Sequence, residues 1–121
     1  MVINPRAAQD DADDRPGDAF LRRALETLTD GILVLSAIRD SGGRLVDERI
    51  EFTNAAWRAY VLGSPDAPDP TGKRLLEAIP AFAERLDAHR HVIETGEARR
   101  ETVPAPGAPR DRWFEADMRR A

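Results

Sequence analysis

The histidines are the first residues of this chain to consider for chemistry, because its 121 residues contain two of them and no cysteine. His89 follows Phe82 and Leu86 at helical spacing, so it falls on the apolar stripe of a predicted helix. His91 falls on another side of that helix and is expected to face solvent. An imidazole in an apolar setting can bind haem iron, but more often it hydrogen-bonds to the backbone or to water. We therefore interpret His89 as a partly buried structural histidine.

The other polar motifs do not assemble a catalytic or metal site. Gly72-Lys73 lacks the surrounding Gly-x-x-x-x-Gly-Lys-Ser/Thr pattern of a phosphate-binding loop. The carboxylates Glu84, Asp87 and Glu94 are spread around a predicted helix, which is typical of solvated charge. The sequence contains no Ser-His-Asp set and no metal-binding pair of histidines, and the lack of cysteine excludes disulfides, thiolate metal sites and cysteine nucleophiles. We expect no catalytic residues, no metal ligands and no enzymatic activity.

The composition indicates a single acidic domain. Asp and Glu (22) outnumber Lys and Arg (18), and the formal net charge of -4 argues against a nucleic-acid-binding surface. No stretch has the apolar length of a signal peptide or a membrane span, so a cytoplasmic protein is expected. Residues 1–17 are acidic and poor in apolar side chains, which predicts a disordered acidic arm. Residues 18–121 fit one domain.

Beyond this arm, apolar periodicity predicts a helix, two strands, three helices and two strands. The first helix has Asp18 as its N-cap, and its apolar side is formed by Phe20, Leu21, Leu25 and Leu28. The strand over 31–39 is apolar on both faces, whereas Ile50 and Phe52 share the dry face of a strand over 45–53. Further helices are predicted over 55–62, 71–79 and 82–95, and further strands over 99–103 and 112–119. This order predicts an α+β fold, an antiparallel sheet with helices on one face and an amphipathic N-terminal helix.

Asn54 stands where the second predicted strand meets a helix. Its side chain can accept hydrogen bonds from the first N–H groups of that helix, so we interpret it as a structural cap rather than a catalytic amide. The aromatic residues have two interpretations, core packing or the lining of a flat cofactor site: Phe52, Trp57, Tyr60 and Trp113. Core packing is favoured, because the buried area of these side chains alone explains their presence.

Five short motifs follow one another in a recognisable order. They are Asp30-Gly31 at the first strand, Asn54-Ala55-Ala56 at the strand-to-helix junction, Gly72 before Leu75-Leu76, Glu94-Thr95-Gly96-Glu97 after the long helix, and Arg112-Trp113-Phe114 in the last strand. In their order and spacing they resemble the PAS family of sensory domains, over residues 18–121. The first hairpin resembles the longer hairpin of bacterial two-component and cyclic-dinucleotide sensors.

The PAS resemblance implies a role in signal transduction. Such a domain binds a small ligand or mediates dimerisation, and it regulates an effector that lies outside this chain, a histidine kinase or a cyclic-dinucleotide enzyme. A ligand-free protein–protein interaction module is the alternative. A haem or flavin sensor is less favoured, because haem-binding relatives carry their histidine about one turn earlier, where this chain has Arg85. We expect no cofactor, and the expected partners are a second copy of the chain or the effector.

The resemblance also assigns candidate binding residues. The ligand pocket between helices and sheet is expected to be lined by Ile32, Val34, Phe52, Leu75, Ile79, Leu86, His89, Ile93 and Trp113. The helix carrying Phe20, Leu21, Leu25 and Leu28 is either a lid on the domain's own sheet or a helix that dimerises and transmits the signal. The resemblance favours the second interpretation.

The chain departs from the PAS pattern at its end. In that family a fifth strand follows the tryptophan-containing strand and lies mid-sheet, beside the first strand, whereas this sequence stops at Ala121. One edge of the first strand is then expected to lack its neighbour. Three interpretations are open: the chain is a fragment of a longer sensor, another chain supplies the strand, or the first and penultimate strands pair directly. We favour a fragment.

Overall fold

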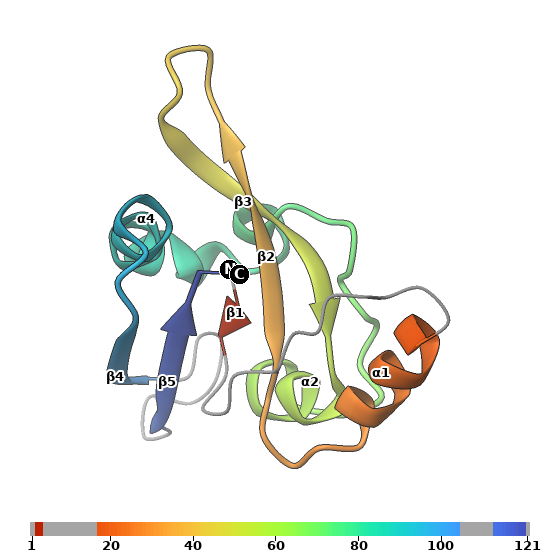
Figure 1. Cartoon of the computed structure of the whole chain (residues 1–121). Coiled ribbons are helices and arrows are strands. Elements are labelled where there is room, and N and C mark those ends of the chain that lie inside the picture. The colour runs from red at the N-terminus through yellow and green to blue at the C-terminus, as the bar shows by residue number, and fades with distance from the viewer. Residues whose placement is uncertain (1, 4–16, 105–112, 121) are drawn as a thin grey trace.

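A computed structural model describes residues 2–3, 17–104 and 113–120, with side chains placed over 19–102 and 115–120. Its elements along the chain are β1 (Val2–Ile3), α1 (Gly17–Glu26), β2 (Leu33–Arg39), β3 (Leu45–Thr53), α2 (Ala55–Leu62), α3 (Leu75–Ala78), the 3-10 helix η1 (Pro80–Arg85), α4 (Leu86–Thr95), β4 (Arg99–Pro104) and β5 (Trp113–Arg119) (Figure 1). The mixed composition of helix and antiparallel strand agrees with the predicted α+β class.

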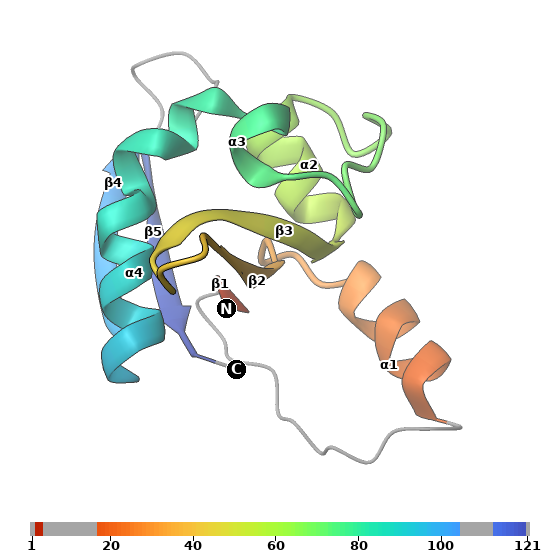
Figure 2. The ribbon, with the colours of Figure 1, turned by 90° about the horizontal axis from the view of Figure 1, so that it is seen from above.

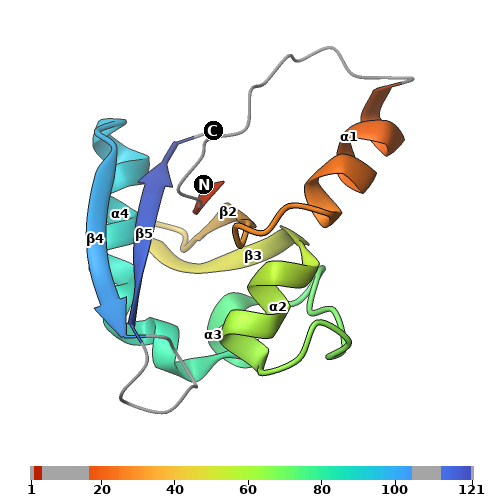
Figure 3. The ribbon, with the colours of Figure 1, turned by 90° about the horizontal axis from the view of Figure 1, so that it is seen from below.

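The strands form two antiparallel pairs that are joined through a short strand. β2 pairs with β3, β4 pairs with β5, and β1 lies between the two pairs, so the order across the sheet is β3-β2-β1-β5-β4. α2, α3, η1 and α4 lie on one side of the sheet, and α1 lies on the other side, next to β2 and β3 (Figures 2 and 3). The hydrophobic interior therefore lies between the sheet and α2, α3, η1 and α4. α1 lies on the opposite face of the sheet and takes no part in this interior.

The N-terminal residues correct two predictions. Val2 and Ile3 are not part of a disordered arm, because they pair with Val34 and Leu33 of β2 and with the end of β5. The edge of β2 that was expected to be open is paired with Val2 and Ile3. Valine and isoleucine favour strands, but the acidic residues that follow dominated the composition of the segment. Residues 4–16 lie outside the described part of the chain.

β3 begins and ends where it was predicted, but its two apolar residues lie on opposite faces. The register passes from Val34 opposite Phe52 to Leu35 opposite Ile50, so Glu51 is an extra residue that forms a β-bulge. Ile50 is fully buried under the helices, whereas Phe52 is half-buried on the other face. There the guanidinium of Arg22 in α1 lies 5.6 Å from the centre of the Phe52 ring. The predicted strict alternation of Ile50 and Phe52 is wrong for this reason.

The helices lie where the sequence predicts them, but several begin or end at other residues than predicted. α2 covers the predicted residues and ends at Gly63, whose φ of 89° is the left-handed conformation typical of a helix end. The predicted helix over 82–95 is divided into η1 and α4, since the 3-10 turn that begins at Pro80 extends to Arg85. α1 extends from Gly17 to Glu26, so Leu28 lies beyond it and Asp18 lies inside it.

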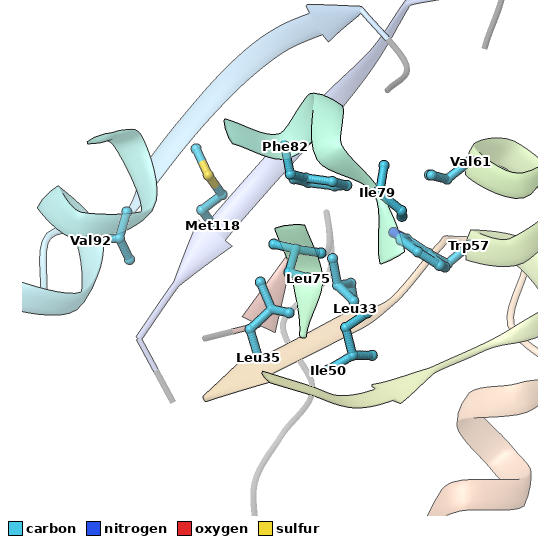
Figure 4. Packing of buried hydrophobic residues seen from close by; sticks show 10 residues of the cluster. All are labelled: Leu33, Leu35, Ile50, Trp57, Val61, Leu75, Ile79, Phe82, Val92 and Met118. Carbon is cyan, nitrogen blue, oxygen red and sulfur yellow. The ribbon is translucent and has the colours of Figure 1, made fainter. Parts of the chain in front are cut away.

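The hydrophobic core lies between the sheet and α2, α3, η1 and α4 (Figure 4). Leu33 and Leu35 of β2, Ile50 of β3 and Met118 of β5 form its floor. The helices contribute Trp57, Val61, Leu75, Phe82 and Val92, and Ile79 comes from the segment between α3 and η1. Trp57 is therefore a core residue, as predicted.

Because the bulge at Glu51 places Ile50 and Phe52 on opposite faces, their substitutions should have different effects on stability. Ile50→Ala should lower the free energy of unfolding by about 2–5 kcal/mol, because it leaves a cavity in a closely packed core. Phe52→Ala should cost clearly less, although it removes a larger side chain, because that ring is already half-exposed. Urea denaturation of both variants measures the difference. An equal or larger loss for Phe52→Ala would show that the two side chains share one face.

Candidate functional site

Asn54 connects three elements at the junction between β3 and α2. Its side-chain oxygen accepts hydrogen bonds from the backbone N–H of Ile32, at 2.9 Å, and of Trp57, at 3.0 Å. Its side-chain nitrogen donates to the carbonyl oxygens of Leu25 and Asp30, both at 2.9 Å. An amide has two donor hydrogens and two acceptor lone pairs, so the hydrogen-bonding capacity of this buried group is fully used.

The bond to Trp57 confirms the predicted cap of α2, and the other three bonds add a role that the sequence analysis missed. They attach the last turn of α1 and the start of β2 to the same side chain. The close approach of these segments also requires Gly31. A Cβ atom at that position would lie 3.1 Å from the Cα of Trp57, which is tighter than an ordinary van der Waals contact. In the sequence, the Asp30-Gly31 dipeptide and the Asn54-Ala55-Ala56 motif marked the two sides of this junction but not their contact.

α1 is held near its C-terminal end by polar contacts. The Arg58 guanidinium on α2 pairs with Glu26 at 2.8 Å, and the Tyr60 hydroxyl donates to the carbonyl oxygen of Thr29 at 3.1 Å. Its apolar side chains are mostly exposed to solvent: Phe20 is 71% exposed and Leu21 is 43% exposed. Leu28, just beyond the helix, is 38% exposed, and Leu25 is partly buried. α1 thus carries an apolar surface that the described residues do not cover.

The predicted pocket residues separate into two groups. Those on the helical side do meet the helix–sheet interior: Leu75, Ile79 and His89 are buried, and Leu86 and Ile93 are partly buried. The prediction is wrong for the sheet side, where Leu33 and Leu35 of β2 face the interior instead of Val34. Ile32 is buried, but it precedes β2 and donates its N–H to Asn54.

Of the remaining two predicted residues, one lies on the other face of the sheet and one has no described side chain. Phe52 lies on the α1 side of the sheet because of the bulge. The side chain of Trp113, in β5, is outside the described part of the structure. Among the described residues, the sheet side of the interior is therefore lined by Leu33 and Leu35 of β2, Ile50 of β3 and Met118 of β5.

A buried polar pair links β3 to α4 within this interior. His89 Nδ1 lies 2.5 Å from Glu48 Oε1, and the two side chains are 1% and 0% exposed. The Phe82 ring lies beside the imidazole, with its centre 6.0 Å away. His89 was expected to bond to backbone or water, and its partner is instead a carboxylate. Glu48 was missed, although it stands two residues before Ile50 and so shares its inward phase.

Glu48 also has an unused acceptor. Its second oxygen, Oε2, is buried and has no hydrogen-bond partner among the described residues. A buried acceptor without a partner costs free energy, about 1–3 kcal/mol. Proteins commonly satisfy such groups with an ordered water molecule or with a ligand. This oxygen is the clearest candidate for a polar anchor in the helix–sheet interior.

A further group of ion pairs, centred on Glu101 of β4, connects that strand to η1. Arg85 pairs with Glu101, and Arg99 Nη2 lies 2.8 Å from Glu101 Oε1. The hydrogen bond from Arg85, assisted by the charges of Arg85 and Arg99, holds the pKa of Glu101 below its ordinary value against the opposing effect of partial burial. Arg85 is thus engaged in joining η1 to the edge strand β4.

The described ranges contain no cluster of three or more His, Asp or Glu side chains that could hold a metal ion. Within the same ranges, no helix has the length and apolar character required to cross a bilayer.

Substitution of Asn54 should loosen α1 more than α2. Asn54→Asp keeps both acceptor bonds but faces the carbonyl oxygens of Leu25 and Asp30 with a carboxylate, and the loss should be about 2–4 kcal/mol of unfolding free energy. Hydrogen exchange should rise over residues 17–28 while the first turn of α2 stays protected. Asn54→Ser, which retains a capping oxygen, is the matched control for α2. Equal exchange in α1 and α2 would contradict this division of roles.

Searches against protein-family models, curated proteins and solved structures give no match to this chain.

Proposed function

We propose that this chain is a PAS-like signal-input and interaction domain, in which α1 mediates self-association and connects the packed core to a partner. The proposal combines the resemblance of the sequence motifs with the arrangement of the elements. The expected partners are a second copy of the chain or an effector domain such as a histidine kinase or a cyclic-dinucleotide enzyme.

One observation carries the proposal. α1 is attached to the domain through the buried Asn54 network, yet its Phe20 and Leu21 are exposed, as is Leu28 just beyond it. Monomeric proteins rarely gather exposed large apolar side chains on one element unless that surface meets a partner. Attachment by a fully satisfied side chain makes α1 part of the domain, while its exposed side chains are available for contact.

The Asn54 network also gives a route between core and partner. Asn54 follows β3, whose Ile50 and Glu48 face the helices, and it holds the last turn of α1 and the beginning of β2. A change in the packing between sheet and helices moves the end of β3, and the same side chain passes that displacement to α1. A ligand or partner then shifts a balance between two arrangements of a dimer.

The position of β1 supports the PAS-like arrangement. It lies beside β2, where the resemblance assigns the fifth strand of the family. The strand here comes from the other end of the chain, so the position is filled while the connection differs. The helices α2, α3, η1 and α4 lie together on one face of the sheet, as in the resemblance (Figure 2).

Self-association through α1 is tested by charge substitution. Phe20→Asp together with Leu21→Asp should weaken dimerisation by at least about 10-fold in Kd, because two carboxylates replace the apolar contact. Val46→Asp is the matched control, since Val46 is 39% exposed but lies on β3. Analytical ultracentrifugation over a range of concentrations gives both constants. A parent chain that stays monomeric at about 100 µM, or an equal effect of the control, would refute the proposal.

A second candidate function is binding of a small ligand in the helix–sheet interior. The buried Glu48 Oε2, which lacks a hydrogen-bond partner among the described residues, favours it. The matching ligand chemistry is a small molecule with an apolar body and one N–H or O–H donor. Haem binding by His89 is less favoured, because the resemblance places the histidine ligand about one turn earlier, where this chain has Arg85.

Native mass spectrometry of the purified chain tests ligand binding. A ligand that uses Glu48 Oε2 should appear as a discrete added mass in the parent chain and be reduced at least about 10-fold in Glu48→Leu, which removes both acceptors. Glu51→Leu, at the exposed bulge, is the matched control. An added mass that persists in Glu48→Leu would place the ligand elsewhere, and the absence of any added mass would remove the support for this candidate. Absorbance in the visible range would reveal haem or flavin directly.

A further inference from the structure

The guanidinium of Arg58, on α2, contacts three other segments of the chain. Its Nη2 donates a hydrogen bond to Glu26 of α1 at 2.8 Å, and its Nε donates to the carbonyl oxygen of Pro65 at 3.2 Å. Its Nη1 donates to the carbonyl oxygen and to the hydroxyl of Thr53, the last residue of β3, both at 3.1 Å. The Arg58 side chain is only 11% exposed. Its charge is therefore screened less by water than that of a surface arginine.

A second carboxylate lies just beyond hydrogen-bonding distance of the same guanidinium. Asp69 Oδ2 is 3.7 Å from Arg58 Nη1, which is too long for a hydrogen bond. The other oxygen, Oδ1, accepts bonds from the Thr53 hydroxyl at 2.8 Å and from the N–H and hydroxyl of Thr71 at 3.0 and 2.7 Å. Burial raises the pKa of Asp69, but the hydrogen bonds from both threonines and the charge of Arg58 outweigh this effect and hold the pKa below its ordinary value. Asp69 is therefore ionised at neutral pH.

The two carboxylates belong to different segments. Glu26 ends α1, whereas Asp69 lies in residues 63–71 between α2 and α3, which we call the 63–71 loop. Both hydrogens of Arg58 Nη1 already have acceptors on Thr53, so the guanidinium must shift before it can bond to Asp69. A guanidinium is a rigid planar fork. A shift of Nη1 thus also moves Nη2 and disturbs the contact with Glu26.

We infer that α1 and the 63–71 loop compete for Arg58, and that each thereby controls the attachment of the other. In the arrangement seen here, Arg58 is bonded to Glu26 and lies 3.7 Å from Asp69. In the second arrangement, α1 gives up this contact and the guanidinium bonds to Asp69, which draws the loop onto α2. Coupling between two sites is reciprocal. A partner that draws α1 away therefore closes the loop, and a partner that holds the loop away from Arg58 tightens α1.

The inference rests on the proposed function in one respect, namely that the position of α1 is the output of the domain. It adds a surface from which that output can be regulated. Pro65, Asp66 and Asp69 of the 63–71 loop are exposed, so a partner can reach the loop directly. The Asn54 network responds to the packing between sheet and helices, whereas Arg58 responds to contacts made on the outside of the domain.

Substitutions that remove one charge distinguish competition from simple structural support. Asp69→Asn removes the competing charge but retains an oxygen that can accept the threonine hydrogen bonds, and Glu26→Gln removes the charged partner on α1. Amide hydrogen exchange over α1 and over the 63–71 loop is measured by NMR for the parent chain and each variant. Glu77→Gln is the matched control for the loss of one negative charge, because Glu77 is exposed on α3. The samples are kept dilute enough to sediment as monomers, so the result does not depend on self-association.

Competition predicts that the two segments respond in opposite directions. Asp69→Asn should slow exchange in α1 by about 3-fold, since ion pairs of this kind change a local opening equilibrium by a few-fold. Glu26→Gln should speed exchange in α1 and slow it in the 63–71 loop by a similar factor. In an Arg58→Gln background, neither substitution should alter the other segment. The control should change neither segment.

Exchange in α1 that is unchanged or faster in Asp69→Asn would show that Arg58 only supports the structure and would overturn the inference. If that chain still dimerises through Phe20 and Leu21, the proposed α1 interface stands without the coupling. Reciprocal effects in a chain that stays monomeric at every concentration would support the coupling and overturn self-association. A like effect of Glu77→Gln would assign the changes to net charge and would also overturn the inference.

Discussion

The four hydrogen bonds of the Asn54 side chain are the constraint on which the arrangement of this domain depends. A single buried amide fixes the end of α1, the start of β2 and the first turn of α2. Because all four of its bonds are made, no alternative side chain of similar size can replace it without leaving a buried backbone group unpaired. Gly31 completes this arrangement, since a Cβ atom there would crowd the backbone of Trp57 at 3.1 Å.

The interior of the domain combines apolar packing with one costly polar feature. The core between the sheet and the helices is built from aliphatic and aromatic side chains, and it provides most of the driving force for folding. The Glu48–His89 pair runs against this pattern, because placing ionisable groups out of water is expensive even when they are paired. Here the pair aligns α4 with β3, and it does so in the region that the ligand hypothesis concerns.

The sequence predicted the features that depend on local interactions, and it missed those that depend on contacts between residues far apart in the chain. β3, α2 and the caps at Asn54 and Gly63 depend on local periodicity and turn chemistry, and their positions were predicted to the residue. The bulge at Glu51 depends on the partner strand, so alternation alone placed Phe52 on the wrong face. The role of Asn54 in holding α1, and the pairing of Glu48 with His89, join residues that are far apart in the sequence. Such contacts have no local signature, and neither does the strand at Val2–Ile3.

The place of β1 in the sheet has a consequence for how this protein folds. Val2 pairs with Arg119, so the centre of the sheet joins residues from the two ends of the sequence. Contacts of such high sequence separation form late, since the chain must close its longest loop before they can stabilise anything. During synthesis, β1, β2 and β3 are made long before β5, so the edge of β1 that pairs with β5 stays open throughout that interval. Intermediates with open strand edges are prone to associate. The growing chain is therefore most exposed to misassembly just before β5 emerges.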